Sequence, residues 1–424
     1  MLASRLLVAF FLLLPLPAAA AEIDVPSEPG ALASAIAGAE EGDILLLRPG
    51  THPGNFIIDR TLTLDGGGAA HLEGPGTGTV LTIDAPGAVV RGLLVTGSGS
   101  SHEEIDSGIK LTQQATGARV ERNVLLDNLY GIDIHGAESA VVVGNVIDGR
   151  QGHRMNERGN GVYIWNAAGA VVEGNDIRWG RDGIFVNTSM RNILRDNRFR
   201  DLRFAIHLMY SNGSEIVDNL SIGNHLGFAL MFSKRLTVIG NRSIGDREHG
   251  IMLNYANEAL IEGNLVTGGP DGRGPEKCVF IYNAHKNRLV GNRFEGCEIG
   301  IHFTAGSERN AITGNAFIGN RTQVKYVGTI WIDWSADGVG NYWSDHPAYD
   351  LDGDGFADAD YKPNDLMDQV LWSQPATKLL LGSPAVQLVR WSQATFPALL
   401  PGGVVDTRPL MRPVEIPDAE WVLR

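Results

Sequence analysis

The 424-residue sequence is poor in positive charge, in long apolar runs and in cysteine. Its 35 lysine and arginine residues are outnumbered by 49 acidic ones, and the net charge of −14 excludes a general nucleic-acid binder with a basic surface. Past the N-terminal region, no apolar stretch reaches the roughly 20 residues of a membrane-spanning helix. The 53 glycines follow no three-residue period, which excludes collagen. Apolar residues at 43% and charged residues at 20% exclude wholesale disorder.

The N-terminus has the pattern of a secretory signal peptide. Arg5 precedes the apolar run Leu6–Leu16, and small residues, Ala18–Ala21, follow it. The run is too short to span a bilayer, and no cysteine follows the expected cleavage site to carry a lipid anchor. We predict that residues 1–21 are removed and that the mature chain is a soluble protein exported to a periplasm.

One repeat runs through most of the chain. A Gly-, Asp- or Arg-Asn dipeptide recurs, mostly every 22 or 23 residues, with its asparagine at Asn123, Asn145, Asn175, Asn197, Asn219, Asn241, Asn264, Asn292, Asn315 and Asn341. A short apolar run keeps the same period between these markers, beginning at Ile109, Ile132, Val162, Ile184, Ile206, Phe228, Ile251, Val279 and Ile301. Two independent markers with one period indicate a structural repeat.

The repeat predicts a right-handed parallel β-helix. Each unit has three short apolar runs separated by turn residues and lacks a helical stretch, which favours three strands per coil of about 22 residues. The asparagines are expected to stack as a ladder at one corner. We assign residues 22–345 to this β-helix, with a helical N-terminal cap near Gly30–Glu41, residues 346–372 to an Asp/Gly-rich closing segment, and residues 373–424 to a C-terminal helical appendage.

The apolar runs that begin at Ile109 and its equivalents predict an unusual outer face. Alternate residues face in and out, and all the inward ones are apolar. The outward ones are rich in methionine, histidine and aromatic residues, so the face is either a satellite core covered by other segments or a functional surface. Thioether and imidazole together suit Cu(I). The copper candidates are His207, Met209, Met231, Met252, Met190 and His135.

Aromatic residues flank these candidates as partner contacts would. The partner-binding candidates on this face are Tyr163, Trp165, Phe185, Phe280, Tyr282 and His302. Insertions at Ser98–Ser107, Arg150–Asn160 and Gly268–Lys277 enter just before the outward strands and are expected to form a wall along the face. We favour partner docking with transient copper handling.

Two further motifs carry metal or redox chemistry. Cys278 and Cys297 fall on neighbouring coils, so they form either a disulfide, which the exported location favours, or a reduced pair that serves a metal. Residues 350–358 resemble a calcium loop, with carboxylates at Asp350, Asp352, Asp354 and Asp358, although Tyr361 stands where an EF-hand has glutamate. The alternative is an acidic surface turn.

The C-terminal segment is a candidate docking element. Ser383-Pro384 predicts the start of a helix that runs to about Phe396, and an extended proline-rich stretch, Pro401–Pro417, follows it. The apolar Trp391 and Phe396 are the candidate contacts, and the alternative is a simple C-terminal cap.

An enzyme is the main alternative, because exported β-helices include polysaccharide lyases, epimerases and hydrolases. Residues Tyr130–Gly136 loosely resemble the Tyr-Gly-x-Asp-Pro-His-Asp site of alginate epimerases, but Ile134 replaces the proline and Gly136 the last aspartate. Hydrolysis needs two carboxylates about one bond, and the outward positions carry one, Asp133. Lys110 is the one basic residue there, which is too little charge for an acidic polymer.

Longer runs resemble the NosD family over nearly the whole expected mature chain. These runs are Gly159–Asn166, Arg181–Ser189, Glu276–Asn283, Gly300–Glu308, Thr322–Gly328 and Gly340–Asp345. The resemblance implies a non-enzymatic periplasmic maturation factor for nitrous oxide reductase that helps to assemble the copper–sulfide centre. It implies four partners: the membrane permease subunit, which would tether the protein, and the cytoplasmic ATPase of an ABC-type transporter, a copper chaperone lipoprotein, and the reductase itself. It supplies no ligand set, so the copper candidates rest on the outward positions alone.

Overall fold

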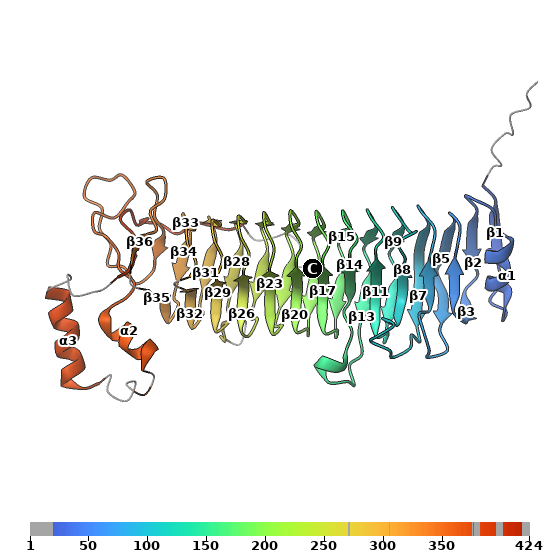
Figure 1. The fold of residues 1–424 in the computed structure, drawn as a ribbon, viewed down its shortest axis with the longest axis horizontal. Helices are drawn as coiled ribbons and strands as arrows, with labels where there is room; N and C mark the ends of the chain where they lie inside the picture. The colour runs from blue at the N-terminus through green and yellow to red at the C-terminus, as the bar shows by residue number, and fades with distance from the viewer. Residues whose placement is uncertain are drawn as a thin grey trace, which may run out of the picture.

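The computed structural model is a long rod built from stacked coils of parallel strands (Figure 1). It describes residues 20–269, 272–304, 306–328, 330–374, 376, 382–395 and 402–417. Most of the predicted signal peptide, residues 1–19, lies outside this range, as do parts of the C-terminal segment that include Phe396. The predicted parallel β-helix is confirmed.

Two parallel sheets form the wall of the rod. The 12-stranded sheet contains β4 (Phe56–Ile58), β6 (Leu81–Ile83), β8 (Ser107–Leu111), β11 (Tyr130–His135), β14 (Val162–Trp165), β17 (Asp182–Asn187), β20 (Phe204–Met209), β23 (Leu226–Met231), β26 (His249–Asn254), β29 (Lys277–Tyr282), β32 (Ile299–Thr304) and β35 (Thr322–Val327). Each strand pairs with its equivalent in the next coil, so a side chain on one coil lies beside its counterpart on the next.

The 24-stranded sheet supplies the other two strands of each coil. It contains β1 (Glu22–Val25), β2 (Ile44–Leu47), β3 (Gly50–Pro53), β5 (Thr63–Glu73), β7 (Val89–Thr96), β9 (Arg119–Glu121), β10 (Val124–Leu126), β12 (Val141–Val143), β13 (Val146–Asp148), β15 (Val171–Glu173), β16 (Asp176–Arg178), β18 (Ile193–Arg195), β19 (Arg198–Arg200), β21 (Glu215–Val217), β22 (Leu220–Ile222), β24 (Thr237–Ile239), β25 (Arg242–Ile244), β27 (Leu260–Glu262), β28 (Leu265–Thr267), β30 (Arg288–Val290), β31 (Arg293–Glu295), β33 (Ala311–Thr313), β34 (Ala316–Ile318) and β37 (Tyr342–Trp343).

A buried amide ladder holds one corner of the coils together, as the asparagine repeat predicts. Asn219 is representative: its Nδ2 donates to the backbone oxygen of Leu194 at 2.8 Å and to Oδ1 of Asn241 at 3.0 Å. Its own Oδ1 accepts from the backbone N–H of Asn197 at 3.1 Å. Because a buried amide without partners is costly, this pattern favours an asparagine in each coil from Asn123 to Asn341.

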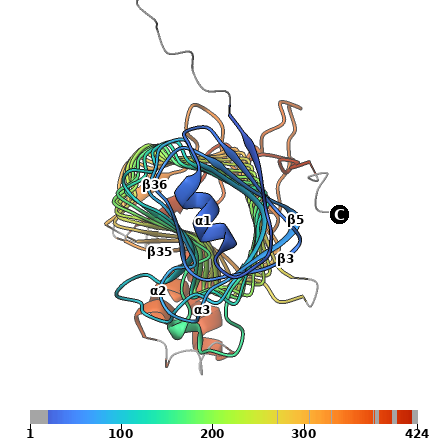
Figure 2. The same ribbon diagram turned by 90° about the vertical axis from the view of Figure 1, so that its right-hand side faces the viewer.

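Helices lie at both ends of the rod. At the N-terminal end, α1 (Ala31–Gly38) lies across the opening of the first coil and buries Leu32 and Ile36 in the core (Figure 2). At the other end lie α2 (Leu366–Ser373) and α3 (Pro384–Thr395), which project from the same side of the rod as the loop that carries the short helix η1 (Met155–Glu157). None of the helices in the described residues has the length and apolar character needed to cross a membrane.

The C-terminal segment divides into two parts. Residues 402–417 pack against the rod: β38 (Gly403–Val405) pairs with β36 (Trp331–Asp333), and the Arg242 side chain donates to the backbone oxygen of Pro417. Helix α3, in contrast, exposes large apolar side chains to solvent, since Leu388 and Trp391 are each 63% exposed. The segment from residue 373 onward is therefore part cap and part projecting helix.

Asp406 joins residues 402–417 to the last coil of the rod by hydrogen bonds. Its carboxylate accepts from the backbone N–H of Asn341 at 2.6 Å and from the indole N–H of Trp343 at 2.8 Å. It therefore ends the asparagine ladder at the last coil, in the place that the next asparagine would take.

Candidate functional site

The outward positions lie in two columns on the 12-stranded sheet, as the alternation predicts. The first column contains Tyr163, Phe185, His207, Ala229, Met252, Phe280 and His302. The second contains His135, Trp165, Asn187, Met209, Met231, Asn254 and Tyr282. Consecutive members are register partners, about 4.8 Å apart along the rod.

A third outward column precedes these two along each strand, and the alternation of inward and outward residues does not predict it. It contains Asp182, Phe204, Leu226, His249 and Lys277. Strict alternation from Ile184 places Asp182 inside. However, Gly183 also faces the core: a Cβ there would lie 2.4 Å from Cδ1 of Phe199. Two consecutive inward residues reverse the parity, and Asp182 faces outward.

Asp182, Arg203 and His207 form a polar cluster in which Asp182 and His207 are buried and Arg203 is partly exposed. Asp182 accepts two hydrogen bonds from the Arg203 guanidinium, at 2.8 and 2.7 Å, and its Oδ2 lies 3.1 Å from Nδ1 of His207. Burial raises the pKa of Asp182, but hydrogen bonds from His207 and Arg203 outweigh it and hold that pKa below the ordinary value. Nε2 of His207 is buried and has no hydrogen-bond partner within the described residues.

Three methionines of the two outward columns, Met209, Met231 and Met252, lie close to His207. Met209 lies opposite Met231 in the next coil, and Met252 lies opposite Ala229. Met231 is therefore directly beside Met209 and diagonal to both His207 and Met252, a separation of roughly 7–8 Å that long side chains can close. Met231 and Met252 also pack with Leu226, Ala229, Phe204 and Phe280 in a small apolar cluster outside the main core. This part of the outer face thus combines apolar packing with soft donor atoms.

Two copper candidates lie apart from this group. His135 stands three coils before Met209 in the second column, about 14 Å away along the rod, and its ring stacks on Trp165 at 4.4 Å. Met190 lies in the turn beyond β17, is 43% exposed and lines a shallow pocket with Glu138 and Asn166. The structure therefore brings four of the six candidates together: His207, Met209, Met231 and Met252.

At the other end of the methionine group, two histidines flank Phe280. The rings of His249 and His302 lie 5.2 and 5.0 Å from the Phe280 ring. Burial lowers the pKa of His249, and burial together with Lys325 and Lys277 lowers the pKa of His302 to about 4. Both imidazoles are therefore neutral at pH 7.

Three of the predicted aromatic contacts, Tyr163, Phe185 and Tyr282, belong to two stacks of rings. Tyr163 and Phe185 continue along the first column to His207, with ring centroids 5.5 and 4.6 Å apart. A second stack, the aromatic ladder, runs along the sheet edge and contains Tyr210, Phe232, Tyr255 and Tyr282. Of these four residues, the sequence pattern predicts only Tyr282 as a contact, because the other three follow the outward strands.

The ladder residues occupy an unfavourable backbone position. Tyr210, Phe232 and Tyr255 have φ of 54°, 49° and 52°, and they are 50%, 36% and 43% exposed. The coils from β11 to β29 have a left-handed turn at this position, which Gly136 and Asn166 occupy at less cost. Exposed aromatic rings at such positions gain little for the fold, which points to a contact surface.

Two of the three inserted loops, Ser98–Ser107 and Arg150–Asn160, contact each other beside the outward strands. Arg150 donates to the backbone oxygens of Ser98 and Gly99, at 3.0 and 2.9 Å, and thereby ties two loops together. His102 spans the same loops, since its ring nitrogens lie 3.3 Å from the Tyr130 hydroxyl and 3.1 Å from the backbone oxygen of Glu157. The η1 loop projects clearly from the rod in Figure 1.

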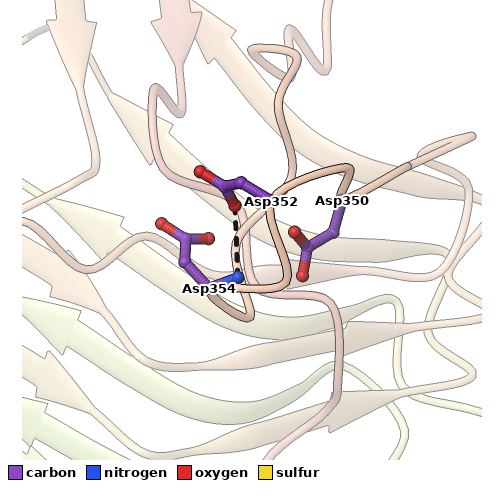
Figure 3. A group of neighbouring side chains, drawn as sticks. All are labelled: Asp350, Asp352 and Asp354. Carbon is purple, nitrogen blue, oxygen red and sulfur yellow. Dashed lines mark hydrogen bonds between the residues drawn. The ribbon is translucent and has the colours of Figure 1, made fainter.

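The acidic loop brings three carboxylates together. Figure 3 shows Asp350, Asp352 and Asp354 around one turn, with oxygens within 4.8 Å of one another. Backbone N–H groups of Gly355 and Gly353 donate to Asp350 and lower its pKa, and Asp354 pairs with Arg408 at 3.1 Å.

The remaining two positions of the loop have structural partners. Asp358 accepts from the backbone N–H of Leu351 at 2.9 Å, and Tyr361 is buried and donates to Asp345. Protein groups thus satisfy this loop, and calcium stays a prediction.

Cys278 and Cys297 form a disulfide with Cα atoms 5.7 Å apart. Both cysteines lie in the core, and because they are joined in a disulfide neither sulfur is a free thiol. The copper candidates of this face are accordingly imidazole and thioether groups.

Comparison with known proteins agrees with the resemblance seen in the sequence. The family model described as NosD, periplasmic copper-binding protein, matches residues 143–348. A protein of Pseudomonas aeruginosa is 42% identical over 86% of this chain and 87% of its own length. One of Stutzerimonas stutzeri is 40% identical over 86% of each chain. The chain belongs to the NosD family. Both relatives carry the name "Probable ABC transporter binding protein NosD".

Solved structures share the fold of this NosD member. An alginate lyase, AlyF-OU02, superposes with a TM-score of 0.56 at 13% identity, over 75% of this chain and 85% of that one. A mannuronic-acid-specific family 6 lyase gives 0.52 at 12% identity, over 75% and 88%. At such identities the likeness concerns the fold alone.

Proposed function

We propose that this protein is a non-enzymatic periplasmic factor that handles copper transiently during assembly of the copper–sulfide centre of nitrous oxide reductase. The observation that carries the proposal is the group of soft donors on the outer face: His207, Met209, Met231 and Met252. The family description as copper-binding and the relatives' name as transporter binding proteins support it. A copper chaperone lipoprotein delivers the ion, and the reductase receives it.

The donor set suits Cu(I) as a cargo. Thioethers and a neutral imidazole are soft or borderline ligands, and they prefer Cu(I) over hard cations such as calcium. His207 offers a buried nitrogen that has no partner among the residues the structure describes, and Met231 lies beside or diagonal to the three other donors. Thioether ligands bind without charge and exchange readily, which fits an ion that passes on to another protein.

Two surfaces serve the partners in this proposal. The aromatic ladder beside the methionine group presents exposed rings to the copper chaperone or the reductase, since aromatic residues commonly anchor interfaces. Helix α3, with exposed Leu388 and Trp391 at the end of the rod, contacts the membrane permease subunit, whose cytoplasmic ATPase completes the transporter. The permease thereby tethers a periplasmic protein to the membrane.

The outer face is poorly suited to polysaccharide chemistry. Asp133, the one carboxylate of the two predicted columns, is fully buried and faces Lys110 and His135 at 3.4 and 3.7 Å. A polymer on the surface cannot reach it. Asp182 is also buried, and both its oxygens are engaged by Arg203 and His207. These arrangements favour a binding protein over a lyase, epimerase or hydrolase.

The decisive experiment replaces Met209, Met231 and Met252 together by leucine. The triple variant keeps apolar bulk and removes the thioethers, so it should fold normally, lose Cu(I) binding in an anaerobic chelator competition, and yield a reductase without its catalytic copper centre. Leucine at Met155, Met190 and Met411, three methionines outside the group, is the matched control. Full maturation with the first variant, or turnover of a uronan by the wild type, would contradict the proposal.

A further inference from the structure

Asp182 is not one of the copper donors, yet it is the residue in closest polar contact with one of them. We propose that Asp182 is a positioning residue: it holds His207 as the Nδ1–H tautomer, so that Nε2 keeps the free lone pair that binds Cu(I). The copper part of this inference rests on the function proposed above, whereas the tautomer does not.

The hydrogen bonds around Asp182 determine which nitrogen carries the proton. A carboxylate only accepts, so the His207 Nδ1 that faces it at 3.1 Å must donate when the ring is neutral. Arg203 fixes the carboxylate with two hydrogen bonds of 2.8 and 2.7 Å. Asp182 is 1% exposed and His207 is 7% exposed, so water does not compete for these bonds.

Packing holds the imidazole in this orientation. Its ring stacks on Phe185 at 4.6 Å with an interplanar angle of 24°, and meets the edge of Phe204 at 5.1 Å and 89°. The Arg203 guanidinium lies over the other aromatic partner, Phe204, 4.3 Å from its centroid. The cluster is therefore fixed by stacking as well as by hydrogen bonds, and a 180° flip of the ring, although it would keep the stacking plane, would lose the hydrogen bond to Asp182.

The second ring nitrogen of His207, Nε2, has no hydrogen-bond partner among the described residues. For a buried polar atom such a state, seen in the described part of the chain, is costly, and a soft metal ion would relieve it. The register partner of His207 in the next coil is Ala229, a small residue in a column of large ones. Its methyl group is fully buried and packs in one small apolar cluster with Met231 and Met252, so both thioether side chains lie on the coils that follow His207.

A carboxylate that orients a metal-binding histidine is a recurrent arrangement, and its loss costs about 10- to 100-fold in metal affinity. Asp182→Asn keeps the shape but removes the charge that favours the Nδ1–H tautomer, and the amide can donate to Nδ1. We expect this variant to shift His207 toward the Nε2–H tautomer and to weaken Cu(I) binding by about 10- to 100-fold.

The first measurement needs no copper. Long-range ¹H–¹⁵N correlation spectra of protein labelled with ¹⁵N-histidine report the tautomer, and His207→Gln identifies the signal. The wild type should show Nδ1 protonated and Nε2 unprotonated, and D182N should show the reverse. The opposite tautomer in the wild type overturns the inference even if the variant fails to fold.

The second measurement is Cu(I) affinity by anaerobic competition with bicinchoninate. Asp176→Asn is the matched control, because Asp176 pairs with Arg200 on the other sheet. The control should bind as the wild type does. A D182N protein that binds Cu(I) with unchanged affinity overturns the positioning role. A wild type with the expected tautomer that binds no Cu(I) overturns the proposed copper function instead.

Discussion

His302 shows how this fold keeps a histidine neutral. Its pKa is lowered to about 4 by burial and by Lys325 and Lys277, whereas an unfolded histidine titrates near 6.5. Between pH 6.5 and 4 the unfolded chain binds the extra proton, so stability is present above this window and is lost as the pH falls through it. Because the ring is partly exposed, we expect a loss of about 1–2 kcal/mol.

His302→Phe tests this contribution. The variant keeps an aromatic ring beside Phe280 and cannot take up a proton, so its melting temperature should fall less than that of the wild type between pH 7 and 4.5. His153→Gln, which changes an exposed histidine of the η1 loop, is the control and should follow the wild type. Parallel melting curves for the wild type and H302F would contradict the expectation.

At the scale of secondary-structure elements, α3 and β38 should behave differently although both follow the last coil. Asp406→Ala, next to β38, leaves the Asn341 N–H and the Trp343 indole unpaired in the core, and each buried unpaired group costs about 1–3 kcal/mol.

Leu388→Asp with Trp391→Asp, on the exposed side of α3, should leave thermal stability unchanged and abolish co-purification with the permease subunit.

The two variants control for each other. Thermal melts should separate the cap from α3, and co-purification from membranes should separate docking from folding. If the L388D/W391D protein retains wild-type co-purification, α3 is not the membrane contact. If D406A melts with the wild type, residues 402–417 do not stabilise the last coil.

At the scale of the whole rod, the strands of each coil pair with those of the neighbouring coils, so damage should stay local. Asn219→Ala removes one member of the amide ladder and leaves the N–H of Asn197 without its partner. Hydrogen exchange should accelerate in the coils of Asn197 and Asn241 and remain unchanged near Asn123 and Asn315. Asn156→Ala, in the exposed η1 loop, is the control. Acceleration along the whole rod would show instead that the coils unfold as one unit.

Much of the architecture can be derived from local pattern, because a solenoid repeats one local solution. The asparagine period predicts the ladder, and the apolar alternation around Ile184 and Ile206 predicts the core and the two outward columns. Pairing between coils follows from that period, so the period alone places Met209 and Met231 side by side. Most contacts join neighbouring coils, and because they recur once per repeat, the residues that make them are recognisable from their spacing in the sequence.

The remainder depends on contacts that no local pattern encodes. Alternation places Asp182 inside, and only the packing of Gly183 against Phe199 turns it outward, so the Asp182–His207 pair stays hidden in the sequence. The pairing of β38 with β36 joins residues about 70 positions apart, so Asp406 gives no local sign that it ends the ladder. His135 and Met190 share the chemistry of the copper candidates, but distance along the rod and a turn separate them from the others. Residue type indicates which side chains can bind a soft metal, and the three-dimensional register decides which of them meet.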